Sequence, residues 1–221
     1  MRSESLLCHV KRAFKPSTTD SNHRLNVYPN LTHGLRLRKL NQVWVADITY
    51  VKLGFDFVYV AVILDRFSRK AIGWAISHEI DTQLTLQALN RAIEDRNPRP
   101  GECIHHSDRG AQYASQAYVH RLEKAGLHIS MSRKGSPYDN GAAESFMKTL
   151  KHEEVHLNDY KTLLDIQKRI PEFLSSVYNK RRLHSSLDYK TPEEFEQKWL
   201  KQPSFRKKLN SQRCGVHNLI P

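Results

Sequence analysis

Residues 42–77 contain three short runs of apolar, mostly β-branched and aromatic residues. The runs cover residues 42–53, 57–64 and 70–77, and short polar segments around Gly54 and Asp65 separate them. Such runs are typical of β-strands, and the intervening segments are short enough to be tight turns. The pattern therefore predicts three antiparallel strands that follow one another directly in a meander.

From residue 81 onward the pattern alternates between helix and strand. Asp81 is typical of a helix N-cap, and apolar residues then recur at helical spacing until a stop signal at Asn97 and Pro98. The elements predicted next are a strand at residues 103–107, a helix at 115–125, a strand at 127–131 and a helix that begins near 139. This order predicts an α/β fold with a mixed five-stranded sheet flanked by helices, in which the strand at 42–53 is central.

The two flanks of the chain show weaker patterns. Residues 1–40 have no sustained period and predict a basic arm with one short helix at most. Residues 161–183 predict two helical pieces broken at Pro171, and Thr191 followed by Pro192 predicts a capped helix. We therefore expect three parts: a basic N-terminal arm (1–40), a core with C-terminal helices (41–200) and a basic tail (201–221).

Composition and charge indicate a DNA-binding protein. The chain has 221 residues and a net charge of +12. Residues 41–144 carry twelve basic and twelve acidic residues, so the whole excess of positive charge lies in the two flanks. A neutral core between basic flanks is what a protein needs to hold a polyanion on both sides of a reaction centre. A solvated basic surface is the plainer alternative.

Other features restrict the class of protein. The longest apolar run is too short to cross a bilayer, and the N-terminus lacks a hydrophobic signal core, so we expect a cytoplasmic protein without a membrane partner. Three scattered cysteines predict neither a disulfide framework nor a Cys-based metal site. His152 and His156 have helical ligand spacing, but no further zinc ligand accompanies them in the sequence.

Three acidic residues stand out as candidate metal ligands. Asp47 interrupts a strand that is apolar on both faces, where a bare carboxylate is costly unless a cation or hydrogen bonds compensate it. Asp108 follows the strand at 103–107, although a turn residue before Gly110 would look the same. Glu144 begins a helix, with Lys148 and Lys151 on its face. If the strands of Asp47 and Asp108 are neighbours, the acids can meet at one edge of the sheet.

Four sequence blocks resemble the retroviral-integrase-like transposases of bacterial insertion sequences. The blocks are Trp44-x-x-Asp47-Ile48-Thr49, His106-Ser107-Asp108-Arg109-Gly110-x-Gln112-Tyr113, Ser132-x-x-Gly135-x-Pro137-x-Asp139-Asn140-x-x-x-Glu144, and Tyr178-Asn179-x-x-Arg182-x-His184 followed by Thr191-Pro192. There are 35 residues between Asp108 and Glu144, the spacing for which the family's motif is named. The resemblance implies a ribonuclease-H-like fold. Family members usually begin with a helix-turn-helix segment, which this chain is expected to lack.

The resemblance implies a polynucleotidyl transferase with Asp47, Asp108 and Glu144 as its catalytic acids. These acids would hold two Mg²⁺ ions, for which Mn²⁺ can substitute, and the ions would activate the attacking oxygen and stabilise the leaving one. Water would cleave the element end, and the freed 3′-hydroxyl would join it to target DNA without a nucleotide cofactor. The family also implies a homo-multimer on DNA. The residues expected to contact DNA are Lys148, Lys151, Arg133, Lys134, Asn140, Arg181, Arg182 and His184.

Three other functions remain open from the sequence. A truncated, non-catalytic product of a mobile element would bind DNA or inhibit the full enzyme, and an intact acid triad does not distinguish it. A ribonuclease-H-type nuclease would share the metal chemistry, although the basic flanks favour strand transfer. A tyrosine recombinase would use Tyr178 with Arg181, Arg182 and His184, but it would leave the acids unexplained.

Overall fold

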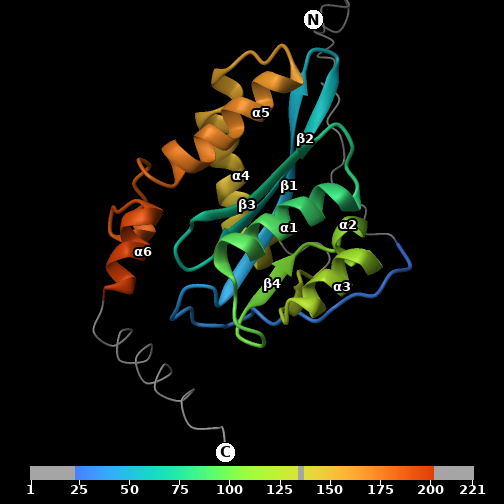
Figure 1. The fold of residues 1–221 in the computed structure, drawn as a ribbon, viewed down its shortest axis with the longest axis vertical. Coiled ribbons are helices and arrows are strands. Elements are labelled where there is room, and N and C mark those ends of the chain that lie inside the picture. The colour runs from blue at the N-terminus through green and yellow to red at the C-terminus, as the bar shows by residue number, and fades with distance from the viewer. Residues whose placement is uncertain (1–22, 134–136, 202–221) are drawn as a thin grey trace, which may run out of the picture.

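The computed structural model describes residues 23–133 and 137–201 and shows a mixed sheet covered by helices on both faces (Figure 1). Its strands are β1 (Val43–Leu53), β2 (Asp56–Asp65), β3 (Ala71–Ser77), β4 (Ile104–Ser107) and β5 (His128–Met131). Its α-helices are α1 (Thr82–Arg96), α2 (Ala111–Ala114), α3 (Gln116–Lys124), α4 (Gly141–Glu153), α5 (Leu163–Glu172) and α6 (Pro192–Leu200). Short 3₁₀ or π segments are η1 (Pro137–Asn140), η2 (Val155–Leu157), η3 (Phe173–Tyr178) and η4 (Ser185–Leu187).

The sheet has the strand order β3-β2-β1-β4-β5. The first three strands form the predicted antiparallel meander, and β4 and β5 pair in parallel with their neighbours. β1 is therefore central, as the sequence predicts. Strand β4 enters beside β1 because a helical crossover, α1, carries the chain back to the same end of the sheet.

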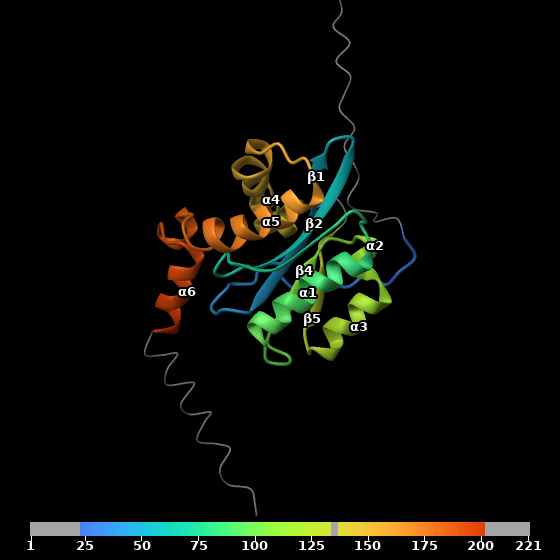
Figure 2. The same cartoon turned by 45° about the horizontal axis from the view of Figure 1, so that its top comes forward.

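Each face of the sheet supports its own apolar core. On one face, Val43, Val45 and Val51 of β1 pack with Phe146 and Leu150 of α4. On the other face, alternate residues of β1, such as Trp44 and Ala46, pack with α1 and α3. Figures 1 and 2 show α4 and α5 on one side of the sheet and α1, α2 and α3 on the other. The period-two alternation along β1 thus decides which side chains meet α4.

Side-chain caps begin the helices that the sequence predicts. Asp81 accepts a hydrogen bond from the backbone N–H of Leu84, and Ser115 accepts one from Tyr118. Thr191 and Glu194 form a reciprocal capping box at the start of α6, with Pro192 at its first position. The sequence did not predict α2, a single turn that follows Gly110.

The predicted break at Pro171 is wrong. Pro171 lies inside α5, which continues directly into the π-helical segment η3. A proline removes one backbone donor, and here the helix absorbs the change by widening to the π form one residue after Glu172. The carbonyl of Pro171 accepts a hydrogen bond from the hydroxyl of Ser175 at 2.7 Å, which helps to keep the chain helical.

The C-terminal helices are tied to the sheet by buried polar contacts. Asn179 exchanges two hydrogen bonds of 2.9 Å with the backbone of Ala71 on the edge strand β3. Glu196 of α6 accepts hydrogen bonds from Ser68 at 2.6 Å and from Arg96 at 2.6 and 3.1 Å. These contacts join α6 and the segment after η3 to the sheet and to α1.

The predicted arm and tail fall largely outside the described residues. Within residues 23–40 the structure contains no helix, whereas residues 1–22 and 202–221 are not described. Across the described part of the chain, no helix is long and apolar enough to span a membrane.

Candidate active site

Strand pairing brings Asp47 and Asp108 to the same level of the sheet. β1 and β4 run parallel, with Val43 opposite Ile104 and Val45 opposite His106. The same register, continued by two residues, places Asp47 opposite Asp108 just past the end of β4. Asp47 also shares the alternation of Val43 and Val45, so its side chain lies on the α4 face of the sheet.

Asp47 is a partly buried carboxylate among other acids. Desolvation by burial, together with the negative charges of Asp108 and Glu144, raises its pKa from 3.8 to about 7. A hydrogen bond of 2.8 Å from the backbone N–H of Ile48 and the positive charge of Lys151 act in the opposite direction. The mutual repulsion of the three acids shows that Asp108 and Glu144 both lie within electrostatic range of Asp47.

Helix α4 is fixed against β1 in the orientation that turns Glu144 toward Asp47. Its N-cap residue, Asn140, is buried and donates a hydrogen bond of 3.2 Å to the carbonyl of Ala46. Two turns beyond Glu144, the ammonium group of Lys151 lies 4.2 Å from the ring centre of Tyr50. Contacts at both ends hold the helix along the strand, and the apolar stripe of α4 packs between them.

The loop that carries Asp108 is supported by buried polar side chains. One oxygen of Asp108 accepts a hydrogen bond of 2.9 Å from Gly110, which closes a tight turn. Behind it, the ring of His106 contacts the hydroxyls of Ser130 and Ser132 at 2.8 and 3.1 Å. Burial lowers the pKa of His106 to about 4, so the ring is neutral and structural at pH 7. Asp108 is therefore the turn residue that the sequence allows, and a turn residue can also bind a metal ion.

Tyr113 is a site residue whose role the sequence did not reveal. Its side chain is buried, and its hydroxyl has no hydrogen-bond partner among the described residues. Besides desolvation and the neighbouring Tyr118, the charges of Asp108 and Asp47 contribute to raising the pKa of Tyr113. The tyrosine hydroxyl therefore lies near both aspartates. Its position in the sequence block His106–Tyr113 indicated that Tyr113 lies near the site, but the spacing does not indicate which residues surround its hydroxyl.

The acids suit a hard divalent cation in chemical type. They supply carboxylate oxygens, the ligands that Mg²⁺ prefers, and a cation between them would relieve the desolvation and repulsion at Asp47. Across residues 23–133 and 137–201, no group of three or more His, Cys, Asp or Glu side chains is drawn together around one point as a finished metal site.

The residues predicted to contact DNA occupy different environments. Lys148, Arg133 and Arg181 are exposed, and Arg133 contacts Asp139 at 3.2 Å. Asn140 and His184 are buried, and Arg182 is paired with Glu153 at 2.8 Å. Lys134 lies outside the described residues. The structure thus gives Asn140 a structural role in place of the open surface position that DNA contact from solvent would require.

Two other candidate features carry less chemistry. The rings of His152 and His156 pack edge to face with their centres 5.4 Å apart, and both residues are exposed.

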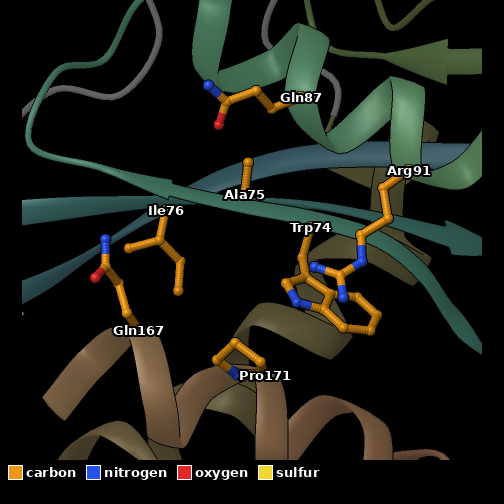
Figure 3. Close-up of a pocket in the computed structure, with 7 residues that line it drawn as sticks. All are labelled: Trp74, Ala75, Ile76, Gln87, Arg91, Gln167 and Pro171. Carbon is orange, nitrogen blue, oxygen red and sulfur yellow. The ribbon is translucent and has the colours of Figure 1, made fainter. Parts of the chain in front are cut away.

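A hollow of about 310 Å³ lies between α1, β3 and α5 (Figure 3). Its one cationic side chain, Arg91, already lies over the ring of Trp74 at 4.0 Å, and Pro171 faces them from α5. None of the three acids lines this hollow.

Solved structures with the same fold include integrase and transposase catalytic domains. The chain matches the core of the simian T-cell lymphotropic virus intasome (TM-score 0.59, 19% identity, 85% of this chain and 62% of that one). It also matches the HTLV-2 integrase catalytic core solved with magnesium (TM-score 0.54, 18% identity, 70% and 95%) and the Mos1 mariner transposase catalytic domain (TM-score 0.51, 15% identity, 78% and 82%). The fold is therefore the ribonuclease-H-like fold of integrase and transposase cores.

Sequence comparison defines the family. Two integrase core domain models match residues 38–137 and 125–192. Similar proteins include the transposase for IS904 of Lactococcus lactis (39% identity, 76% of this chain and 66% of that protein) and a 31 kDa protein of IS600 from Shigella sonnei (40%, 88% and 71%). The chain belongs to the insertion-sequence transposases with an integrase core domain. It spans about two thirds of the length of these relatives.

Proposed function

We propose that this protein cleaves DNA strands at the ends of a mobile element and transfers them to target DNA. Asp47, Asp108 and Glu144 are its catalytic acids in this proposal. The supporting observation is their approach to one edge of the sheet, where Asp108 and Glu144 both perturb the carboxylate of Asp47. A surface that only adhered to DNA would have no need of a desolvated group of like charges.

The chemistry requires divalent cations, and Mg²⁺ bound by the three acids would activate the attacking oxygen and stabilise the leaving oxygen of an in-line displacement. The protein's own residues supply the positioning. Strand β1 carries Asp47, the tight turn after β4 carries Asp108, and the Asn140 anchor holds the helix that carries Glu144 against β1. Mn²⁺ is expected to replace Mg²⁺ at such a site.

Exposed basic side chains would position the DNA backbone around the acids. Lys148 lies on the face of α4 that carries Glu144, and Lys151 lies one turn further, over Tyr50. Arg133 precedes η1, and Arg181 follows η3. Such contacts hold phosphates without reading sequence. We also propose that the protein acts as a homo-multimer on element ends and target DNA in the bacterial cytoplasm, without a nucleotide cofactor.

The test is metal-dependent nicking of a DNA duplex that carries the element end. Asp47→Asn, Asp108→Asn and Glu144→Gln should each reduce cleavage on the order of 10³-fold or more, because each removes a charged ligand that acts in the transition state. DNA affinity should stay within a few-fold of wild type. Matched controls are Asp56→Asn and Glu172→Gln, which remove the same charges from exposed positions.

Two results would overturn the proposal. Robust cleavage by any of the three acid variants would exclude that acid from catalysis. Binding of DNA by the wild-type chain without any Mg²⁺- or Mn²⁺-dependent cleavage would instead favour the non-catalytic DNA-binding product that the sequence leaves open.

A further inference from the structure

A polar pocket of about 320 Å³ lies on the other flank of α4 from Glu144. Ala142, Ser145 and Thr149 line it from the helix. At 100° per residue these positions lie about 100–160° around the helix from Glu144, with the buried stripe of α4 on one side between the two flanks. The pocket is thus separated from the acids by about the width of one helix, on the order of 10 Å.

The opposite wall of the pocket contains a buried hydrogen-bond donor without an acceptor. His184 is 9% exposed, and its ring packs edge to face on Tyr178 with the ring centres 5.1 Å apart. Its Nδ1 lies 3.5 Å from a guanidinium nitrogen of Arg182, which can only donate, so Nδ1 must accept. The proton of the neutral ring then lies on Nε2. This buried Nε2 has no partner among the described residues.

Desolvation keeps this histidine neutral. Burial, helped by the charges of Arg182 and Arg69, lowers the pKa of His184 to about 4. The ring is therefore neutral at pH 7 and keeps a single N–H donor. An unpaired buried donor costs on the order of 1–3 kcal/mol, and an acceptor from a ligand would remove that cost.

Arg69 supplies a positive charge without an internal counter-ion. It lines the pocket from the turn between β2 and β3, and its guanidinium has no hydrogen bond or ion pair within the described chain. Its φ of +64° is in the left-handed region, where a residue other than glycine or asparagine is uncommon. Arg182 also lines the pocket, but Glu153 balances its charge at 2.8 Å. Hydroxyls of Ser145, Ser185 and Ser186 complete the lining.

We propose that this pocket holds a backbone phosphate of the bound DNA, with Arg69 and the Nε2–H of His184 as its principal donors. His184 is among the residues that the sequence predicts to contact DNA, and unlike Asn140 it lines a pocket that a phosphate can enter. A phosphate matches the donor set because it offers several acceptor oxygens and a negative charge to one unpaired cation, one buried N–H and several hydroxyls. The inference rests on the proposed function, since it makes the pocket a second grip on DNA beside the acids. It also adds Arg69, which the sequence blocks do not single out.

The experiment measures DNA affinity at several salt concentrations with a fluorescently labelled duplex, without divalent metal so that no cleavage occurs. Arg69→Asn removes the charge but tolerates the left-handed backbone. It should weaken binding several-fold and lower the salt slope by about one unit, because one phosphate contact is lost. Arg69→Lys should restore the slope in large part. Lys124→Gln, an exposed charge removal on α3, is the matched control and should not change it.

The second measurement follows the ring N–H of His184 by NMR in the wild-type protein. A resonance shift on addition of DNA supports the proposal. A shift with inorganic phosphate alone but none with DNA would show that the pocket takes a free anion, and would overturn the assignment to the DNA backbone. An unchanged ring resonance with both ligands would overturn the pocket as a phosphate site altogether.

The outcomes separate this inference from the proposed function. If wild-type protein cleaves DNA but Arg69→Asn binds with wild-type affinity and salt slope, the pocket proposal fails and the catalytic one stands. If the wild-type chain does not bind DNA, both fail together.

Discussion

Asp47 and Asp65 are two desolvated aspartates on the same sheet, but the hydrogen bonds and charges that surround them differ. Both lie on strands with apolar neighbours, and in both desolvation is the largest influence and raises the pKa. Asp65 accepts hydrogen bonds from the backbone N–H groups of Asn41, Phe67 and Ser68 at 2.7, 2.8 and 3.2 Å. Asp47 accepts one hydrogen bond, from the backbone N–H of Ile48. The charged residues near it include two acids, Asp108 and Glu144.

The charges around the two aspartates differ as well. The positive charge of Arg96 lowers the pKa of Asp65 and so opposes the effect of burial, and Arg96 also forms an ion pair with Glu196. Asp65 and Glu196 are therefore a buried acidic pair with its own cation. At Asp47 the nearby cation, Lys151, is shared with the ring of Tyr50. The protein therefore completes one buried acidic cluster by itself and leaves the other incomplete. An incomplete cluster of this kind is typical of a functional site.

Removing the cation of the completed cluster should cause a large loss of stability at any pH near neutrality. Arg96→Met leaves Glu196 and Asp65 buried without their guanidinium, and it should cost about 3 kcal/mol of the free energy of unfolding. Lys70, 3.4 Å from Glu196, keeps the expected loss at the lower end of the usual range. Urea denaturation measures the change. The control is Arg99→Ala, at an exposed position, which should hardly change the free energy of unfolding. An equally small loss for Arg96→Met would show that the cluster does not contribute to stability.

The contribution of the incomplete cluster to the free energy of unfolding should fall as pH rises, which is opposite to the behaviour of a carboxylate in an ordinary salt bridge. The folded pKa of Asp47, about 7, lies above its unfolded value of 3.8, so folding favours the protonated form. Ionisation therefore removes stability as pH rises between these two values, by up to about 4 kcal/mol at pH 8 without metal. Asp47→Asn should abolish this pH dependence and make the metal-free protein more stable than wild type at pH 8.

Mg²⁺ provides a complementary measurement at the same acids. At pH 8 a saturating concentration, about one hundred times Kd, should stabilise the wild type by about 2.7 kcal/mol, because the folded state alone binds the ion. The Asp47→Asn protein should gain much less. A thermal shift of equal size in both proteins would show that Mg²⁺ acts elsewhere.

The smallest effect should come from Tyr113, whose hydroxyl faces both aspartates but has no partner in the described structure. Tyr113→Phe should leave the free energy of unfolding unchanged or raise it by up to about 1 kcal/mol, because it removes an unsatisfied buried group. Denaturation and the nicking assay should be compared on the same protein. Reduced cleavage with undiminished stability would indicate that the hydroxyl finds its partner in the loaded site. A loss of stability would show that the hydroxyl already has a structural role.

Much of the fold follows from local patterns. The meander was predictable because turns at Gly54 and Asp65 separate runs with strong strand preference. The helix starts at Asp81, Ser115 and Thr191 were predictable because a side-chain cap depends only on residues three apart. Pro171 was misread because proline usually breaks a helix, whereas here a π segment and packing on the sheet keep the chain helical.

The sequence by itself determined which residues could do the chemistry, since the three acids, their strand or helix settings and the basic flanks are all local features. Tertiary structure decided what surrounds them. It buried Asn140 against Ala46, left the Nε2–H of His184 without an acceptor among the described residues, and placed Arg69 in the same pocket as His184. Burial and charge compensation depend on atoms that are distant in the chain, and local periodicity carries no information about them.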